Sequence, residues 1–460
     1  MAANNVPATM RALRYNEYGN AFDVIQLHDN VPVPRPAAGE LLVRQYASAL
    51  DPVDYKIMNG NLTIVEIGRD FPIIPGFNIA GVVADRGSGC KREDMQVGSA
   101  VISYANVRQR GALAEYVCVP ERICAPAPAG VPLLEASTLP LVGTTSWQAL
   151  YNIGKLKKGE SVLILGGTTA TGLAGLQIAR ALGASRVACT CSERNFDLVR
   201  SLGATDPIDY RTKDWRDEMQ DGKFDVVYDC VGGYVSYEAC QDPKRGIMNL
   251  SREKDRHCYV TICGDQQGYL GPARMLQSGA QIGSRKIASL VPVSLGGTSP
   301  NYDLYTAKPT QEAIEILAAF AEGGERANAA FRARTRDPNY SVADIEGWKP
   351  LRVLIEESYP FDEIERVKAA FEKLMSGRSR GKQVIVFHQE GKEEVVGEKK
   401  EGMEGEKEEQ SEENEKGQSE EKREEQKEGK EEEQEGKEEE QEGKEEEEKE
   451  DKDEKEEQSE

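Results

Sequence analysis

The chain has 460 residues and a formal net charge of −22, but this charge is unevenly distributed. From residue 389 onward there are 36 acidic and 14 basic side chains, so the first 388 residues carry equal numbers of acidic and basic groups, 44 of each. Because residues 1–388 are neutral overall, they offer no basic surface for a nucleic acid. Their number predicts two domains with substantial cores. No apolar run in the sequence has the length of a membrane span.

Residues 11–135 alternate short apolar runs with turn residues, and this pattern predicts a small β-barrel or sandwich. Ten prolines separate the runs. The clearest strands are 41–44, 80–83, 99–102 and 114–119. Two helical segments follow, around 136–139 and 146–153.

The stretch from Ser161 to Arg194 predicts a βαβ unit that binds a dinucleotide. An unbroken apolar run at 162–165 is typical of a strand buried on both faces of a parallel sheet. A turn rich in Gly and Thr, 166–172, leads into an Ala- and Leu-rich helix that stops at Gly183, and 186–191 predicts a second strand. Glycines in such a turn let backbone N–H groups face a pyrophosphate at the helix N-terminus.

The turn departs from the G-x-G-x-x-G pattern at its middle position. With Gly167 and Gly172 as the first and third glycines, Thr169 stands where close approach to the phosphates favours Gly. Threonine hydroxyls are an alternative source of phosphate contacts, and the candidate cofactor-binding residues of the turn are Gly167, Thr168, Thr169, Ala170, Thr171 and Gly172. A βαβ turn that binds nothing is the competing interpretation.

The residues after the second strand favour NADPH over NADH. In NAD-binding proteins an acidic residue about 20 residues beyond the glycines takes the ribose 2′-hydroxyl. Here Ser192 and Arg194 occupy that place, and a hydroxyl with a guanidinium suits a 2′-phosphate. Glu193 lies between them and would favour NADH if it pointed inward.

The βα pattern continues toward residue 388. Strands at 225–230 and 259–263 run into glycines, and ligands of open α/β sheets lie beyond the carboxyl ends of strands. Cys230, at the end of the first of these strands, and Val231 and Gly232, just past it, are therefore candidate cofactor contacts. We further predict a last sheet strand at 286–291, an amphipathic helix at 311–322, an inserted polar loop at about 324–349, a strand at 353–355, a helix at 361–375 and a closing strand at 384–387.

Residues 389–460 form a tail rich in Glu and Lys that offers almost nothing to bury. Its seven-residue unit, KEEEQEG from Lys430, has no apolar position and therefore does not predict a coiled coil. We predict a disordered acidic tail, with a basic protein as its candidate partner.

The cysteines and histidines argue against disulfides and against zinc. Nine cysteines, an odd number, are scattered through mostly apolar segments, which is typical of reduced intracellular thiols. None of the three histidines belongs to a metal-ligand motif. The first ten residues resemble neither a secretory signal nor a transit peptide, so we expect a cytoplasmic protein, with organellar import through an unconventional signal left open.

Several segments together resemble one family. They are 48–56 (SALDPVDYK), 74–81 (IPGFNIAG), 139–150 (LPLVGTTSWQAL), the glycine turn, 229–233 (DCVGG) and 376–382 (SGRSRGK). In this order they resemble the zinc-free branch of the medium-chain dehydrogenase/reductase superfamily, and within it the quinone oxidoreductase-like proteins and alkenal/enone reductases. The resemblance covers about residues 10–388. It implies an α/β fold with a GroES-like β-barrel domain, 10–135 and 345–388, and a Rossmann doubly wound parallel sheet, 136–344, between its two parts.

The same resemblance implies that no metal takes part. Zinc-dependent relatives carry Cys and His-Glu where this chain has Asp51 and Gly76-Phe77, and their cysteine-rich loop for structural zinc is missing here. Asn78 stands where relatives usually carry Asp.

A reductase of this family moves hydride from a nicotinamide to a quinone or a conjugated carbonyl. Tyr55 and Lys56 are the candidate catalytic residues, because the matching segment faces the nicotinamide in relatives. Lys56 would hydrogen-bond the developing oxyanion, and Tyr55 would donate a proton or shape the pocket. The alternatives are packing for Tyr55 and a surface charge for Lys56. By the same resemblance Thr145 contacts the cofactor near its nicotinamide end, unless it is a helix cap, and Tyr210 lies near the adenosine ribose.

Two functions of different classes remain open. The first is an NADPH-dependent, zinc-independent reductase of quinones or α,β-unsaturated carbonyls. The second is an NADPH-binding interaction protein with little turnover, whose acidic tail recruits a basic partner. A homodimer is one option for its assembly, and the sequence names no particular substrate.

Overall fold

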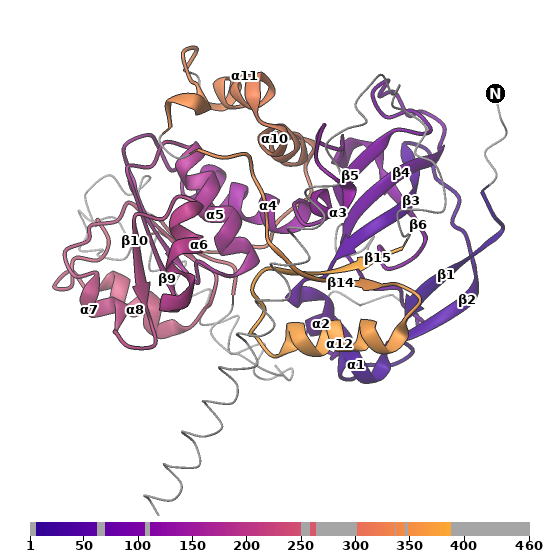
Figure 1. Cartoon of the computed structure of the whole chain (residues 1–460), viewed down its shortest axis with the longest axis horizontal. Helices are drawn as coiled ribbons and strands as arrows, with labels where there is room; N and C mark the ends of the chain where they lie inside the picture. The colour runs from indigo at the N-terminus through magenta and orange to yellow at the C-terminus, as the bar shows by residue number, and fades with distance from the viewer. Residues whose placement is uncertain are drawn as a thin grey trace, which may run out of the picture. The chain divides into compact units, whose positions relative to one another are not determined.

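The computed structural model describes residues 6–61, 70–105, 111–249, 258–263, 301–335, 337–345 and 348–387. All of them lie in the first of the chain's two units, residues 1–390. Their strands form three sheets, of two, six and seven strands (Figure 1). No helix in these ranges has both the length and the apolar character that a membrane span requires.

The seven-stranded sheet is built from both ends of the described chain. Its order is β14-β15-β3-β4-β5-β7, with β6 also paired to β3. The strands are β3 (Glu40–Ala49), β4 (Asn78–Arg86), β5 (Ala100–Tyr104), β6 (Tyr116–Pro120), β7 (Cys124–Pro126), β14 (Ile355–Pro360) and β15 (Lys382–Val386). A hairpin-like pair, β1 (Thr9–Arg14) and β2 (Gln26–Pro32), forms the separate antiparallel two-stranded sheet.

Helix α12 (Ile364–Met375) packs beside α1 (Ala21–Val24) and α2 (Pro52–Met58), although it comes more than 300 residues later in the chain (Figure 1). Its buried residues, Val367, Ala370, Phe371 and Leu374, recur at the spacing of one helical face. This apolar face explains why the C-terminal segment returns to the N-terminal sheet, where β15 pairs antiparallel to β3.

The six-stranded sheet is parallel throughout, with the order β10-β9-β8-β11-β12-β13. Its strands are β8 (Ser161–Leu165), β9 (Arg186–Cys191), β10 (Asp206–Asp209), β11 (Val226–Asp229), β12 (Cys258–Thr261) and β13 (Asn301–Leu304). The chain runs outward from β8 in one direction to β10 and then restarts beside β8 at β11. The strand order therefore reverses between β8 and β11, which is where doubly wound sheets bind their ligands.

Helices cover this sheet and connect it to the other one. They are α3 (Leu133–Ala136), α4 (Pro140–Trp147), a π-helical turn (Gln148–Ile153), α5 (Ala170–Ala181), α6 (Phe196–Ser201), α7 (Trp215–Glu218), α8 (Tyr234–Gln241), α10 (Gln311–Glu322) and α11 (Gly324–Thr335), with short 3-10 helices at Glu121–Ile123, Glu193–Asn195 and Val342–Asp344.

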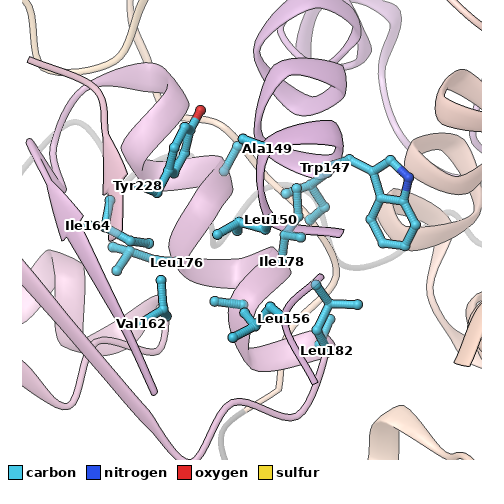
Figure 2. Packing of buried hydrophobic residues seen from close by; sticks show 14 of the residues in the cluster. Trp147, Ala149, Leu150, Leu156, Val162, Ile164, Leu176, Ile178, Leu182 and Tyr228 are labelled. Atoms are coloured by element: carbon cyan, nitrogen blue, oxygen red, sulfur yellow. The ribbon is translucent and has the colours of Figure 1, made fainter. Parts of the chain in front are cut away.

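A large apolar cluster fixes α4 and α5 on the central strand β8 (Figure 2). Leu176 of α5 lies beside Ile164 of β8, Ile178 lies on the other side of α5 beside Leu150, and the buried ring of Trp147 extends the cluster to the end of α4. Complete burial of one such side chain contributes about 1.5–3 kcal/mol. The first turn of α5 is thereby held at a fixed place above the end of β8.

Several sequence predictions need correction. The segment predicted as a polar inserted loop, 324–349, contains helix α11, because Ala327 and Phe331 are buried one turn apart and Phe331 stacks edge-on against Phe320 of α10. The strand predicted at 353–355 lies instead at Ile355–Pro360. The strand predicted at 286–291 and the tail from 389 lie outside the described residues, and β13 was not predicted.

Candidate functional site

The glycine turn between β8 and α5 is the centre of the candidate site. Gly166 has φ of +83°, a conformation that favours glycine. A Cβ atom on Gly172 would lie 2.2 Å from the carbonyl oxygen of Gly166, and one on Gly167 would lie 2.8 Å from Sγ of Cys189. The backbone of the turn at Gly172 and the side chain of Cys189 at Gly167 therefore leave no room for a Cβ atom at these two places.

Thr169 is the N-cap of α5. Its Oγ1 accepts a hydrogen bond from the N–H of Gly172 at 3.0 Å and donates one to the carbonyl of Gly166 at 2.8 Å. Threonine is a favoured N-cap because its oxygen satisfies a donor that the helix leaves open. The hydroxyl expected to contact phosphate is thus engaged inside the turn, and the non-glycine at the middle position has a structural reason.

The start of α5 fits an anion. Ala170 and Thr171 are its first residues, and backbone N–H groups in a first turn have no carbonyl partner within the helix. With the partial positive charge of the helix N-terminus they suit a pyrophosphate. Thr168, Thr169, Ala170 and Thr171 are half-buried, and Gly167 and Gly172 are buried beneath them.

Thr190 of β9 stabilises this turn through two hydrogen bonds, although it was not among the predicted site residues. Its Oγ1 accepts from the N–H of Gly166 at 2.9 Å, and its carbonyl accepts from the N–H of Gly167 at 2.8 Å. The position is the penultimate residue of the second strand, but no sequence rule distinguishes a bracing Thr there from an ordinary strand residue.

Ser192, Arg194 and Tyr210 lie at the neighbouring strand ends. Ser192 follows β9 and is half-buried, while Glu193 and Arg194 are exposed in a short 3-10 helix. Tyr210 follows β10 with 58% of its surface exposed, and its N–H donates to the carbonyl of Cys191. The pairing of β9 with β10 thus brings together the predicted ribose-end residues, which come from different segments.

On the other side of β8, Asp229 shapes the turn that follows β11. One carboxylate oxygen accepts from the N–H groups of Val231 and Gly232 at 2.9 and 2.8 Å, and the other accepts from the Tyr259 hydroxyl at 2.7 Å. Burial raises the pKa of Asp229, while these hydrogen bonds act in the opposite direction. Cys230 is buried in this turn and Val231 is exposed. Sequence reasoning included the turn but not this role of Asp229.

Tyr55 and Lys56 lie on α2, which begins at the capping residue Asp51. Both are half-buried. Burial raises the pKa of Tyr55, and the nearby Cys263 thiol raises it further. Burial raises the pKa of Cys263 to about 11, and the positive charge of Lys56 lowers it. Because Cys263 follows β12, these electrostatic interactions place α2 near the carboxyl end of the six-stranded sheet.

Thr145 lies within α4, and its hydroxyl donates to the carbonyl of Leu141 one turn earlier at 2.7 Å. The alternative of a helix cap is therefore wrong, since the N-cap of α4 is Leu139. The adjacent Ser146 contacts the carbonyl of Thr171 at 2.8 Å and the hydroxyl of Tyr228 at 3.2 Å. These contacts join α4 to the start of α5 and to β11.

Asp51, which stands at a zinc-ligand position of zinc-dependent relatives, forms a buried ion pair with Lys382 at 2.6 Å. Within the described ranges, no group of three or more His, Cys, Asp or Glu side chains could hold a metal ion. Activity without metal stays a prediction.

Two protein families match the chain. The alcohol dehydrogenase GroES-like domain family matches residues 37–129, and a family described as zinc-binding dehydrogenase matches residues 202–385. The first range falls on the seven-stranded sheet, and the second runs from the six-stranded sheet to β15.

Named relatives and a solved structure agree with these matches. The chain is 37% identical over 237 residues to an NADPH-dependent alkenal/one oxidoreductase of Arabidopsis thaliana, covering 50% of this chain and 59% of that protein. It is 34% identical over 231 residues to a chloroplast envelope quinone oxidoreductase homolog of the same plant, covering 49% and 69%. A quinone oxidoreductase from Coxiella burnetii has the same fold, with a TM-score of 0.62, 22% identity and coverage of 83% of this chain and 100% of the other. The chain thus spans about three fifths of the alkenal/one oxidoreductase.

Two features define a medium-chain dehydrogenase/reductase. The seven-stranded, GroES-like sheet is completed by the C-terminal segment, and the six-stranded, doubly wound sheet (the nucleotide sheet) comes between its two parts in the chain. The chain belongs to the quinone oxidoreductase-like branch of this superfamily. The family resemblance and the α/β fold class predicted from the sequence are confirmed. The domain boundaries 10–135, 136–344 and 345–388 stay predictions.

Proposed function

We propose that this protein is an NADPH-dependent, zinc-independent reductase of quinones or α,β-unsaturated carbonyls. The observation that carries the proposal is the position of α2, which brings Tyr55 and Lys56 within electrostatic reach of Cys263 at the end of β12. The candidate acid and cation would then act at the same edge of the six-stranded sheet as the glycine turn. The names of the relatives, an alkenal/one oxidoreductase and a quinone oxidoreductase homolog, support the substrate classes.

The cofactor residues fit a dinucleotide. Its pyrophosphate would face the first turn of α5, whose backbone N–H groups have no carbonyl partner within the helix. Ser192 and Arg194 would bind the 2′-phosphate, Tyr210 would flank the ribose, and Thr145 with Cys230, Val231 and Gly232 would lie toward the nicotinamide. When bound, the reduced nicotinamide supplies the hydride.

Tyr55 and Lys56 would act on the negative charge that develops on the substrate oxygen. Because burial raises the pKa of Tyr55, its hydroxyl stays protonated at neutral pH and is able to donate a proton or a hydrogen bond. The ammonium group of Lys56 would stabilise the same oxygen, and a preorganised charge of this kind is worth more in a half-buried site than in water. Neither role requires a metal ion.

The finer parts of the proposal have separate grounds. The preference for NADPH rests on the hydroxyl of Ser192 and the guanidinium of Arg194, which suit a 2′-phosphate. A cytoplasmic location stays a prediction, since two relatives carry chloroplast names. A homodimer and a basic partner for the acidic tail are also predictions.

The test is oxidation of NADPH by the full-length protein over a panel of quinones and conjugated enones. We expect turnover with at least one class, and a loss of about tenfold or more on Lys56→Met, which removes one charge-assisted contact of about 1.5–3 kcal/mol. Lys213→Met, at an exposed lysine paired with Glu218, is the matched control and should leave turnover unchanged. Tight NADPH binding without oxidation by any member of the panel would contradict the proposal.

A further inference from the structure

A buried polar cluster joins the two helices that carry the proposed nicotinamide-end residues. It consists of Asp51, Asn78 and Lys382, which are 3%, 0% and 2% exposed. Nζ of Lys382 donates to Oδ1 of Asp51 at 2.6 Å, and Nδ2 of Asn78 donates to the other carboxylate oxygen of Asp51, also at 2.6 Å. The end of β3 and the starts of β4 and β15 thus meet at the carboxylate of Asp51.

Each partner of Asp51 comes from a different part of the fold. Asp51 is the N-cap of α2, and its N–H donates to Oδ2 of Asp54 at 2.8 Å. Lys382 is the first residue of β15 and lies 331 positions away in the chain. Asn78 is the first residue of β4, and its Nδ2 also donates to the carbonyl of Ala49 at 2.8 Å.

The amide of Asn78 reaches both functional helices at once. Its Oδ1 accepts from the N–H of Leu141, in the first turn of α4, at 3.0 Å. Its Nδ2 contacts Asp51 at the start of α2. Tyr55 lies one turn beyond Asp51, and the Thr145 hydroxyl donates to the carbonyl of Leu141. One planar side chain therefore sets the distance between the helix of Tyr55 and Lys56 and the helix of Thr145.

Stability alone does not account for such a cluster. Removing a lysine and a carboxylate from water costs several kcal/mol per ion, and well-packed apolar residues of the same volume are often as stable or more so. What a hydrogen-bonded buried cluster provides is a defined geometry, because amide and carboxylate groups accept partners only in fixed directions. That property matters where a catalytic group must be placed accurately.

We propose that Asn78, anchored by the Asp51–Lys382 ion pair, is a positioning residue that holds α2 against α4 and so places Tyr55 and Lys56 relative to the nicotinamide end of the cofactor. The assignment of Tyr55, Lys56 and Thr145 rests on the proposed reductase function. The Asn78 side chain is fully buried, and its amide forms hydrogen bonds with Ala49, Asp51 and Leu141. Its effect passes through the two helices.

The test compares Asn78→Ser with Gln177→Ser in the full-length protein. Asn78→Ser removes the bridge to Leu141 and leaves the Asp51–Lys382 pair in place. Gln177 is a matched control, because it is another buried amide whose two ends bond one distant residue, the carbonyl and N–H of Arg352 at 2.7 and 3.0 Å. If Asn78→Ser does not fold, Asn78→Asp is the second variant: it keeps the size and the Leu141 contact but loses the donor to Asp51, so it breaks the bridge at the α2 end and should give the same results.

Three measurements separate positioning from general destabilisation: the dissociation constant for NADPH, the single-turnover rate of hydride transfer at saturating NADPH, and hydrogen exchange of the peptides that contain α2 and α4. A displacement of about 1 Å can cost on the order of a hundredfold in rate, so we expect hydride transfer to slow by at least about tenfold. NADPH affinity should change by less than about threefold, since the glycine turn is untouched. Exchange should rise together in 52–58 and 140–147, but not in β8 and β9.

Gln177→Ser should show none of this pattern, even if it lowers the melting temperature. The proposal is overturned if Asn78→Ser leaves hydride transfer unchanged, or if rate and NADPH affinity fall in parallel for both variants. If the wild-type protein oxidises NADPH with no quinone or enone, the proposed function fails. The hydrogen-exchange comparison still decides the positioning role, and exchange that rises in α2 without α4 contradicts it.

Discussion

Replacing Gly172 by Ala tests whether the turn before α5 binds the cofactor phosphates. The added Cβ would lie 2.2 Å from the carbonyl oxygen of Gly166 and 2.9 Å from the backbone of Gly167. Both neighbours are backbone atoms and no rotamer change relieves the contact, so the turn must open by about 1 Å to restore normal van der Waals separation. Overpacking of this kind costs about 1–3 kcal/mol of stability, offset in part by the better helix propensity of Ala, about 1 kcal/mol.

The same opening should weaken NADPH binding. A shift of about 1 Å takes an N–H donor from a normal distance of about 2.9 Å out of hydrogen-bonding range. Loss of one bond to a charged phosphate costs about 1.5–3 kcal/mol, which corresponds to a dissociation constant roughly 10- to 100-fold higher. We would measure it by fluorescence titration with NADPH, alongside denaturant unfolding of each variant.

Gly175→Ala is the matched control, one turn further along the same helix. Its Cβ would lie 3.1 Å from the Tyr228 ring, a contact that a shift of a few tenths of an ångström relieves without moving the turn. NADPH affinity of this variant should equal that of the wild-type protein within about twofold. If Gly172→Ala binds NADPH as tightly as Gly175→Ala does, the turn does not cradle the phosphates.

Four further predictions follow from named residues. Arg194→Ala should weaken NADPH by at least about 1.5 kcal/mol and NADH little, and equal losses in titrations with both would exclude a 2′-phosphate contact. Because burial raises the pKa of Tyr55 above its ordinary value of 10.0, its hydroxyl stays protonated below pH 10. Turnover should therefore show no decline below pH 10 that depends on Tyr55, and the pH profiles of the wild-type protein and Tyr55→Phe will be compared to check this. Chelators and added zinc should leave turnover unchanged, whereas one tightly bound zinc per chain in elemental analysis would refute the metal-free mechanism. A chain ending at His388 should keep its melting temperature and kinetics and lose retention on an anion-exchange column, because the removed segment carries the whole net charge of −22; a melting temperature lower by several degrees would show that the tail docks on the body.

The sequence predicted best those elements whose burial is local in the chain. The apolar run of β8, the glycine turn and the Ala- and Leu-rich face of α5 are contiguous, and the structure confirms all three. Helix α11 was missed because only Ala327 and Phe331 are buried in a mostly polar segment, so its stability comes from packing on α10. Strand β13 alternates polar and apolar residues over only four positions, which is too short a run to identify a strand, and it is a strand because it pairs with β12.

The residues of the candidate site were predicted or missed for the same reason. Residues next to a strand end or a helix start, such as Ser192 and Thr171, follow from the order of elements. The roles of Asp229 and Asn78 do not, because each depends on partners from other elements, Tyr259 in one case and Asp51 and Leu141 in the other. Thr169 illustrates both sides: its departure from glycine was visible in the sequence, but its capping role required the geometry.

The pairing of β15 with β3 has a consequence for synthesis of the protein. Asp51 emerges from the ribosome early, yet its partner Lys382 is 331 residues further on, which at about 5–20 residues per second means a delay of roughly 15–70 seconds. The nucleotide sheet is contiguous in the chain and is complete before β15 is made. A nascent chain therefore reaches a stage at which the glycine turn is complete while the carboxylate of Asp51, beyond the end of β3, still lacks its partner Lys382. Cofactor captured on the ribosome would stabilise this half-finished protein, and binding partners that recognise exposed strand edges would have their longest opportunity during the same interval.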